Sequence, residues 1–232
     1  MNVRNLLLPY VLSLALALSV LAMTLPWWSV RTSNEAGTVL GGSANIDLEL
    51  WQSVSVVLTV NRTRSVVLGF SDLVSNGQDL SDLSNVLNVT LILAIIGVAF
   101  TAVLWVLSIF SLLRGSSFVS GRLFYLLVVV DGILLLAAPL NMYSSLYPPV
   151  TKLDTFSTFS FPSSWIQIYP RDITSFVGSL SIPGNIGFPK YLVGYSFWSW
   201  GPGAGWFFSF TSALLLFSVA ILSRRVAPRK SV

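Results

Sequence analysis

Apolar residues in this chain are concentrated in four long runs, at residues 5–28, 89–113, 123–143 and 205–223. A bilayer core about 30 Å thick requires about 20 apolar residues in an α-helix. Each run reaches that length, so the pattern predicts four transmembrane helices. The first run is longer than the roughly 7 to 15 apolar residues of a signal-peptide core, so we expect it to be retained as a helix.

A shorter hydrophobic period appears in the segment between the first and second runs, residues 29–88. The β-branched stretches SVSVVLTV and RSVVLGF are separated by NRT, which predicts a β-hairpin over residues 50–70. Capping Ser and Asp residues, followed by leucines at helical spacing, then predict a short helix over 72–87.

The segment between the third and fourth runs, residues 144–204, is rich in Ser, Thr, Pro and aromatic residues. Its prolines exclude long helices, whereas residues 155–161, 165–169 and 191–198 can each supply a strand. We therefore expect this segment to extend the same outer antiparallel sheet. Its low charge and many aromatic residues indicate a packed or partner-covered surface.

Composition supports a membrane protein. Hydrophobic residues make up 54% of the chain and charged residues only 9%, against about 25% charged residues in soluble domains. No basic stripe with interleaved aromatic residues is present, which argues against nucleic-acid binding. The chain has no Cys and no His, so we expect no metal site and no cofactor. No base lies beside a nucleophile in any motif, and we do not expect an enzyme.

The basic residues predict the orientation of the chain. Seven of them, and no acid, flank the runs at the amino terminus, in the short segment between the second and third runs, and at the carboxyl terminus. Segments 29–88 and 144–204 together hold six basic and eight acidic residues. The positive-inside rule therefore places both termini in the cytoplasm and both long loops outside the cell membrane. Trp27, Trp28, Trp200 and Trp206 fall near the predicted outer boundary, where indole rings favour the lipid interface.

Asp131 is the only charged residue within the four runs. Intramembrane acids are costly and point to a functional site. The sequence provides hydroxyl groups at similar depth, including Thr101, so a hydrogen-bonded link between helices is one interpretation. Proton or ion handling is the other, although no second ionisable group forms a relay.

Several motifs resemble the claudin and peripheral myelin protein superfamily. PWWSV closes the first run, Leu50 and Trp51 open the hairpin, and GYSFWSWGPGAGW precedes the fourth run. The family pattern is a Trp after the first helix, then Gly-Leu-Trp, then two Cys on adjacent strands. Trp28 matches the first element, Glu49 replaces the Gly, and Val54 stands at the first Cys position. The likeness covers roughly residues 20–113 and 194–223.

This resemblance implies one integral membrane domain over residues 1–232, a left-handed four-helix bundle carrying a small extracellular antiparallel sheet. It also implies a non-enzymatic role in lateral or cell-to-cell association, with membrane lipid and a second copy or other membrane proteins as partners. We expect Trp28, Leu50, Trp51, Trp198 and Trp200 to form the interaction and structural motif. Two alternatives remain: an accessory subunit of a larger membrane complex, and a small ion or proton pathway through Asp131.

The sequons at Asn61 and Asn88 lie in the predicted outer segment and are candidate glycosylation sites. Asn61 falls at the hairpin tip, which makes it the more accessible acceptor, whereas Asn88 lies close to the membrane. The absence of Cys and the serine-rich, weakly charged loops also suit a hot or acidic habitat, which suggests an archaeal source.

Overall fold

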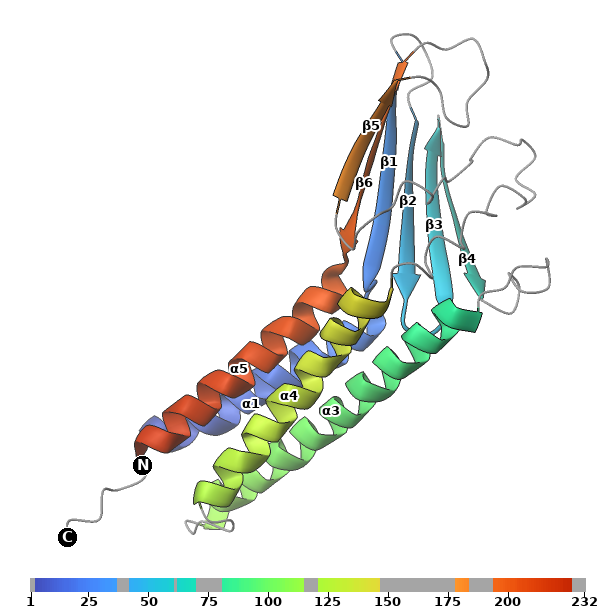
Figure 1. Cartoon of the computed structure of the whole chain (residues 1–232). Helices are drawn as coiled ribbons and strands as arrows, with labels where there is room; N and C mark the ends of the chain where they lie inside the picture. Colours follow the sequence, from blue (N-terminus) through green and yellow to red (C-terminus); the bar gives the residue numbers. More distant parts are fainter. Residues whose placement is uncertain are drawn as a thin grey trace. The chain divides into compact units, whose positions relative to one another are not determined.

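The computed structural model describes residues 3–36, 42–60, 62–69, 81–114, 121–146, 178–183 and 194–226. This part of the chain is mainly helical, with four helices and one antiparallel sheet (Figure 1). It divides into two compact units, which we call the helical unit (residues 1–24, 89–140 and 205–232) and the sheet unit (residues 25–88 and 141–204).

The helices are α1 (Val3–Thr24), α3 (Ser81–Arg114), α4 (Gly121–Ser145) and α5 (Ala204–Val226). Among the described residues, three helical stretches are long and apolar enough to cross a membrane: Ser81–Arg114, Leu123–Ser145 and Ala204–Ile221. The apolar stretch of α1, Leu8–Thr24, is shorter than these. Length and composition therefore support a membrane protein.

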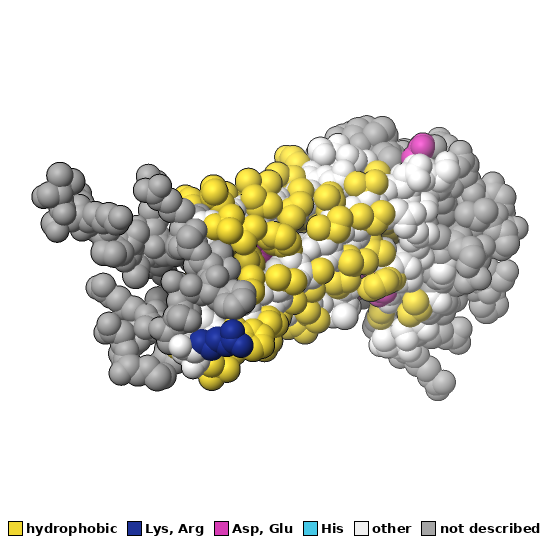
Figure 2. Space-filling view, turned by 90° about the horizontal axis from the view of Figure 1, so that it is seen from below, with side chains coloured by type: hydrophobic (Ala, Val, Ile, Leu, Met, Phe, Trp, Pro, Cys, Tyr) yellow, Lys and Arg dark blue, Asp and Glu magenta, His cyan; other side chains and the backbone are white. Residues whose placement is uncertain are grey.

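Side chains from all four helices form one hydrophobic cluster. It comprises Leu12, Ala15, Leu104, Val128, Leu135, Ala213, Leu216, Val219 and Ala220. The outward-facing positions are also apolar: Ile92, Val103 and Phe110 of α3 are exposed, and hydrophobic side chains cover much of the described helix surface in Figure 2. A helix that is apolar on every side requires an apolar solvent, and lipid provides one.

The sheet contains six strands in the order β4-β3-β2-β1-β6-β5, and all neighbours are antiparallel (Figure 1). The strands are β1 (Trp28–Ala36), β2 (Gly42–Glu49), β3 (Ser53–Val60), β4 (Arg62–Gly69), β5 (Gly178–Pro183) and β6 (Gly194–Pro202). The segment between α1 and α3 supplies the meander β1 to β4, and the segment between α4 and α5 is the second one to contribute strands. The second supplies β5 and β6, and β6 pairs with β1.

The two faces of the sheet differ because apolar and polar residues alternate along the strands. In one cross-strand row, Trp28 faces Leu48 and Leu48 faces Val54, and all three are buried. In the neighbouring row, Ser29 faces Asp47, which faces Ser55. One face of the sheet therefore contributes to a core, and the other carries mostly small polar side chains.

The hairpin predicted over residues 50–70 matches β3 and β4, but the sequence reasoning missed β1, β2 and β5. We expected the first helix to continue to residue 28, whereas α1 ends at Thr24 and Trp28 begins a strand. Pro26 explains this end, because a residue that precedes proline disfavours the helical conformation.

The separate helix expected over residues 72–87 also differs from the structure. Residues 81–88 form the first turns of α3, which continues without a break into the apolar stretch. Neither Pro nor Gly occurs between Ser81 and Ile96 to end it. Residues 71–80 lie outside the described part. The same holds for the strands expected at 155–161 and 165–169, whereas the third expected strand overlaps β6.

Candidate functional site

The turn between β2 and β3 is the most unusual feature of the sheet unit. It comprises Leu50, Trp51 and Gln52, the motif singled out from the sequence. Leu50 is fully buried, whereas the Trp51 side chain is 55% exposed. Two adjacent residues of the turn thus differ sharply: the Leu50 side chain packs in the protein interior, and the large aromatic side chain of Trp51 lies at the surface.

Gln52 adopts a left-handed backbone conformation, with φ of 57°. For an L-residue this region costs about 1 to 2 kcal/mol relative to the right-handed one. Such conformations persist where the surrounding structure enforces them, and they are frequent at functional sites. At Gln52 the enforcing contacts come from α3.

Three side chains hold the turn against α3. Gln52 Nε2 donates a hydrogen bond to Asn88 Oδ1, and Ser84 Oγ donates to Gln52 Oε1 at 3.2 Å. Asn88 Nδ2 lies 3.5 Å from Ser84 Oγ, which closes the triangle. Both polar ends of the Gln52 amide are therefore occupied, and the turn is fixed to the first two turns of the helix.

The second candidate feature is β4, the strand at one edge of the sheet. It pairs with β3 and has no second neighbour among the described strands. On its polar face Thr63 and Ser65 are exposed, and the Val67 side chain is 64% exposed. β4 has eight residues and no proline, so its backbone is competent to pair with another strand. At the opposite edge, β5 is shorter and ends at Pro183.

The polar face of the sheet contains a small hydrogen-bonded cluster. Ser29 Oγ donates to Asp47 Oδ1 at 2.6 Å, and Asn45 Nδ2 donates to Asp47 Oδ2 at 2.8 Å. At the end of β2, Ser53 Oγ donates to Glu49 Oε2 at 2.6 Å. The contacts of Ser29 and Ser53 tie neighbouring strands together, whereas the contact between Asn45 and Asp47 lies within β2. In the described ranges, no three His, Cys, Asp or Glu residues are grouped so that they could hold a metal ion.

Three of the four tryptophans expected in a lipid interface are buried in the protein, and Trp206 is half-buried. Trp27, Trp28 and Trp200 are buried by the protein, so for these three side chains the interfacial interpretation was wrong. Trp27 is fixed through its backbone, because its N–H donates to Leu48 O at 2.9 Å and its carbonyl accepts from Gly203 N at 2.9 Å. Trp198 lies in β6, opposite Thr32 of β1 and Leu180 of β5.

Asp131 is completely buried in the helical unit. Thr101 Oγ1 of α3 lies 2.8 Å from Asp131 Oδ2 and 3.0 Å from the carbonyl oxygen of Gly97. The second carboxyl oxygen, Asp131 Oδ1, is buried without a hydrogen-bond partner. This geometry links α3 to α4 through a single hydroxyl group.

Further polar links connect helices in this unit, and two of them reach α1. Ser212 Oγ of α5 donates to Ala15 O of α1 at 2.7 Å, and Trp105 Nε1 of α3 donates to Ser13 Oγ at 2.6 Å. Hydrogen bonds between helices within a membrane contribute about 0.6 kcal/mol on average. Asp131 is therefore one of several polar contacts between helices, as the structural interpretation of the sequence expects.

Only one of the two sequons lies in the described part of the chain. Asn61 lies outside the described residues. Asn88 is described, and its amide is engaged with Gln52 and Ser84, while Thr90 of the same sequon is fully buried. An asparagine in this setting is a structural residue of the turn and a poor acceptor for a glycan.

No protein-family model matches this chain, and no curated protein matches it in sequence.

Proposed function

We propose that this chain is a non-enzymatic, claudin-like protein of the cell membrane, in which a left-handed bundle of four spans carries an outer sheet that mediates association. Three long apolar helices and a hydrophobic cluster shared by four helices support the membrane-embedded bundle. The shorter apolar stretch of α1 becomes the fourth span. The six-stranded antiparallel sheet is the counterpart of the small sheet that the family resemblance implies.

In this proposal both termini are cytoplasmic. The support is the distribution of charge along the sequence, with seven basic residues and no acid in the three segments assigned to the inside. The sheet and both long loops then face the exterior. The proposal therefore implies two partners: membrane lipid around the helices, and another protein chain bound to the sheet.

The observation that carries the association is the position of β4, which has no second neighbour among the described strands. An edge strand presents unpaired backbone N–H and C=O groups, which another strand can extend. β4 combines eight residues, no proline and the exposed side chains Thr63, Ser65 and Val67. We assign the partner as a second copy of this chain, either in the same membrane or in an apposed one.

A pair of serines provides a matched test. Ser65 of β4 and Ser199 of β6 are exposed and lie in one cross-strand row on the same face, which runs through Val57, Asn45 and Arg31. Ser65→Lys adds a charge at the edge, and Ser199→Lys adds the same charge inside the sheet. Lysine at an edge blocks strand pairing.

The measurement is native mass in mild detergent and in nanodiscs. The wild-type chain and Ser199→Lys are expected to self-associate, while Ser65→Lys weakens association by roughly tenfold, or about 1.4 kcal/mol. Equal association of the two variants would contradict pairing through β4, and a monomeric wild-type chain would contradict self-association. Co-purification of foreign subunits with a monomeric chain supports the accessory-subunit alternative instead.

The unpartnered Asp131 Oδ1 favours a second candidate, an ion or proton pathway. Proteoliposomes that contain the wild-type chain would then show a proton or cation flux that Asp131→Asn abolishes. Absent flux, or flux that the variant leaves unchanged, rejects this pathway.

A further inference from the structure

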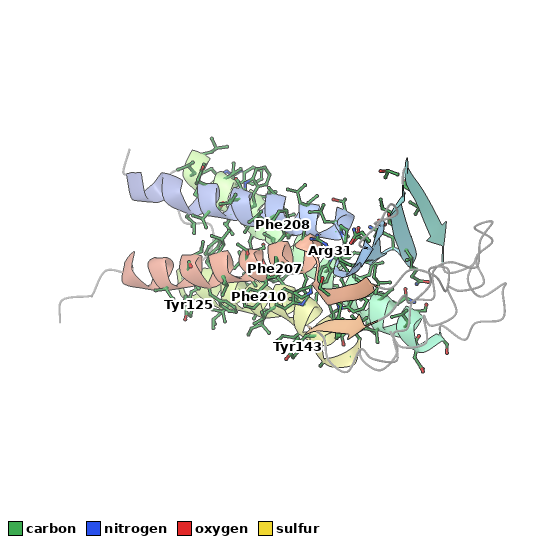
Figure 3. The ribbon with its side chains drawn as sticks, turned by 90° about the horizontal axis from the view of Figure 1, so that it is seen from above. Arg31, Tyr125, Tyr143, Phe207, Phe208 and Phe210 are labelled. Carbon is green, nitrogen blue, oxygen red and sulfur yellow. The ribbon has the colours of Figure 1, made fainter. Side chains whose placement is uncertain are left out.

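Two large aromatic side chains of the sheet unit are exposed although they belong to distant parts of the sequence. Trp51 in the β2–β3 turn is 55% exposed, and Tyr143 near the end of α4 is 56% exposed. Figure 3 shows the Tyr143 side chain pointing away from its helix. Both residues combine an apolar ring with a polar group, which is the chemistry that favours the interface of a lipid bilayer.

Hydrogen bonds place these two residues at the same level of α3. The Trp51 turn is fixed to Ser84 and Asn88 through Gln52. The segment of α4 that holds Tyr143 is fixed by Asn141, whose Nδ2 donates to Val86 O at 3.4 Å. Ser84 and Asn88 are four residues apart, or about 6 Å along a helix axis. The segments that hold Trp51 and Tyr143 are therefore bonded to α3 at positions within about one helical turn of each other.

This level coincides with a change in the exposed side chains of α3. Before it, the exposed residues are polar: Ser81, Asp82 and Asn85. From Val89 onward they are apolar: Val89, Ile92, Ile95 and Ile96. Because α3 is one continuous helix, we expect the hydrocarbon boundary of a bilayer next to Asn88, where its exposed side chains change from polar to apolar. The attachment points of Trp51 and Tyr143 lie at that boundary.

The four tryptophans near the predicted outer boundary are less exposed than Trp51. Trp27, Trp28 and Trp200 are buried, and Trp206 donates its indole N–H to the carbonyl oxygen of Pro139 at 2.9 Å. Trp206 also stacks on Phe210, with ring centroids 5.3 Å apart. Trp27, Trp28 and Trp200 therefore present little surface to lipid, whereas Trp51 and Tyr143 expose more than half of theirs.

We propose that Trp51 and Tyr143 are the outer-leaflet anchors of this protein, with their rings inserted among the headgroups and upper acyl chains of the lipid. The partner of the Trp51 turn is then a lipid surface rather than a protein. The strained Gln52 conformation and its bonds to α3 serve to hold Trp51 at a fixed depth. This inference requires the chain to be membrane-embedded, but it does not depend on self-association through β4.

The absence of Cys from the chain permits a direct measurement of depth, because a single introduced Cys is unique. Trp51→Cys and Tyr143→Cys are labelled with a nitroxide in phosphatidylcholine nanodiscs that hold one copy of the chain. Ile92→Cys serves as the hydrocarbon control and Ser199→Cys as the aqueous control, since both positions are exposed. Accessibility to oxygen and to a water-soluble nickel complex reports depth at each position.

Labels at 51 and 143 are expected to give one common depth between the two controls, equal within about one helical turn of 5 Å. Labels as accessible to nickel as the label at 199 would overturn the proposal. A second measurement retains the native tryptophan: lipids brominated near the headgroup are expected to quench the wild-type chain more than Trp51→Phe, while lipids brominated at the chain end quench both equally. Identical quenching by the shallow bromines would also overturn it.

One copy per nanodisc separates this result from the proposed association. If Ser65→Lys leaves the oligomeric state unchanged while the depth measurement succeeds, the association through β4 fails and the lipid anchors remain. If the labels at 51 and 143 are in water while Ser65→Lys disrupts oligomers, the lipid anchors fail and the association through β4 remains.

Discussion

Gln52 Nε2 donates a hydrogen bond to Asn88 Oδ1, although 36 residues separate the two along the chain. This contact fixes a strained turn of the sheet to the first turns of α3, and it occupies the side chain of a sequon. Two of the following predictions arise from it.

Substitutions of Gln52 should separate backbone strain from hydrogen bonding. Gln52→Ala keeps the left-handed conformation unfavourable and loses both amide contacts, whereas Gln52→Gly loses the same contacts but adopts φ of 57° without strain. We expect Gln52→Ala to lower the free energy of unfolding more than Gln52→Gly, by about 1 kcal/mol. Denaturant or thermal unfolding in detergent measures the stabilities of the two variants. A Gln52→Gly variant less stable than Gln52→Ala would show that residue 52 does not keep its left-handed φ in solution.

Asn88 should carry no glycan, because its amide contacts Gln52 and Ser84 while Thr90 is buried. In a host that glycosylates such sequons, the mass of the chain is expected to stay unchanged in Asn88→Gln apart from the substitution itself. Intact-protein mass spectrometry of the wild-type chain and of Asn61→Gln provides the comparison. A glycan mass lost only in Asn88→Gln would contradict the structure of the turn.

Asp131 and Thr101 should behave as a coupled pair. Asp131→Ala removes the carboxyl group, and Thr101→Val removes the hydroxyl while keeping the shape of the side chain, so each substitution deletes the contact. We expect a coupling energy of about 0.6 kcal/mol, and up to about 1.7 kcal/mol, in a double-mutant cycle. Additive effects of the two substitutions on unfolding would show that the contact contributes nothing to stability.

Two glycines differ in what surrounds them, and this predicts different costs of substitution by alanine. A Cβ on Gly203 would meet the backbone carbonyl group of Pro26, with the carbonyl carbon at 2.8 Å. A Cβ on Gly132 would meet the ring of Phe217 at 3.0 Å, and a side chain can shift. Overpacking costs about 1 to 3 kcal/mol.

We therefore expect Gly203→Ala to fall at the upper end of that range and Gly132→Ala at the lower end. Thermal unfolding of the two variants in one detergent measures the difference. Equal losses of stability in the two variants would mean that the Pro26 backbone moves as easily as the Phe217 ring.

Hydrophobic patterning located most of the helical structure, because apolar runs near 20 residues have few alternatives to a membrane span. It also located β3 and β4, where β-branched residues are dense. It missed β1, β2 and β5, whose sequences are rich in Ser, Asn and Gly and lack a local strand signal. Those strands form because pairing in a sheet supplies the hydrogen bonds and the buried neighbours that their own residues do not specify.

The sequence alone determined that this chain is apolar enough for a membrane, that Asp131 lies within a long apolar run and that Leu50 and Trp51 open a hairpin. These properties depend on composition and local spacing. Only the tertiary structure decided which aromatic side chains are buried and which are exposed. Trp28 and Trp51 have the same side chain, but cross-strand packing buries the first, and the Gln52–Asn88 contact holds the turn that exposes the second. Burial depends on residues that are far apart in the chain, so no local pattern can specify it.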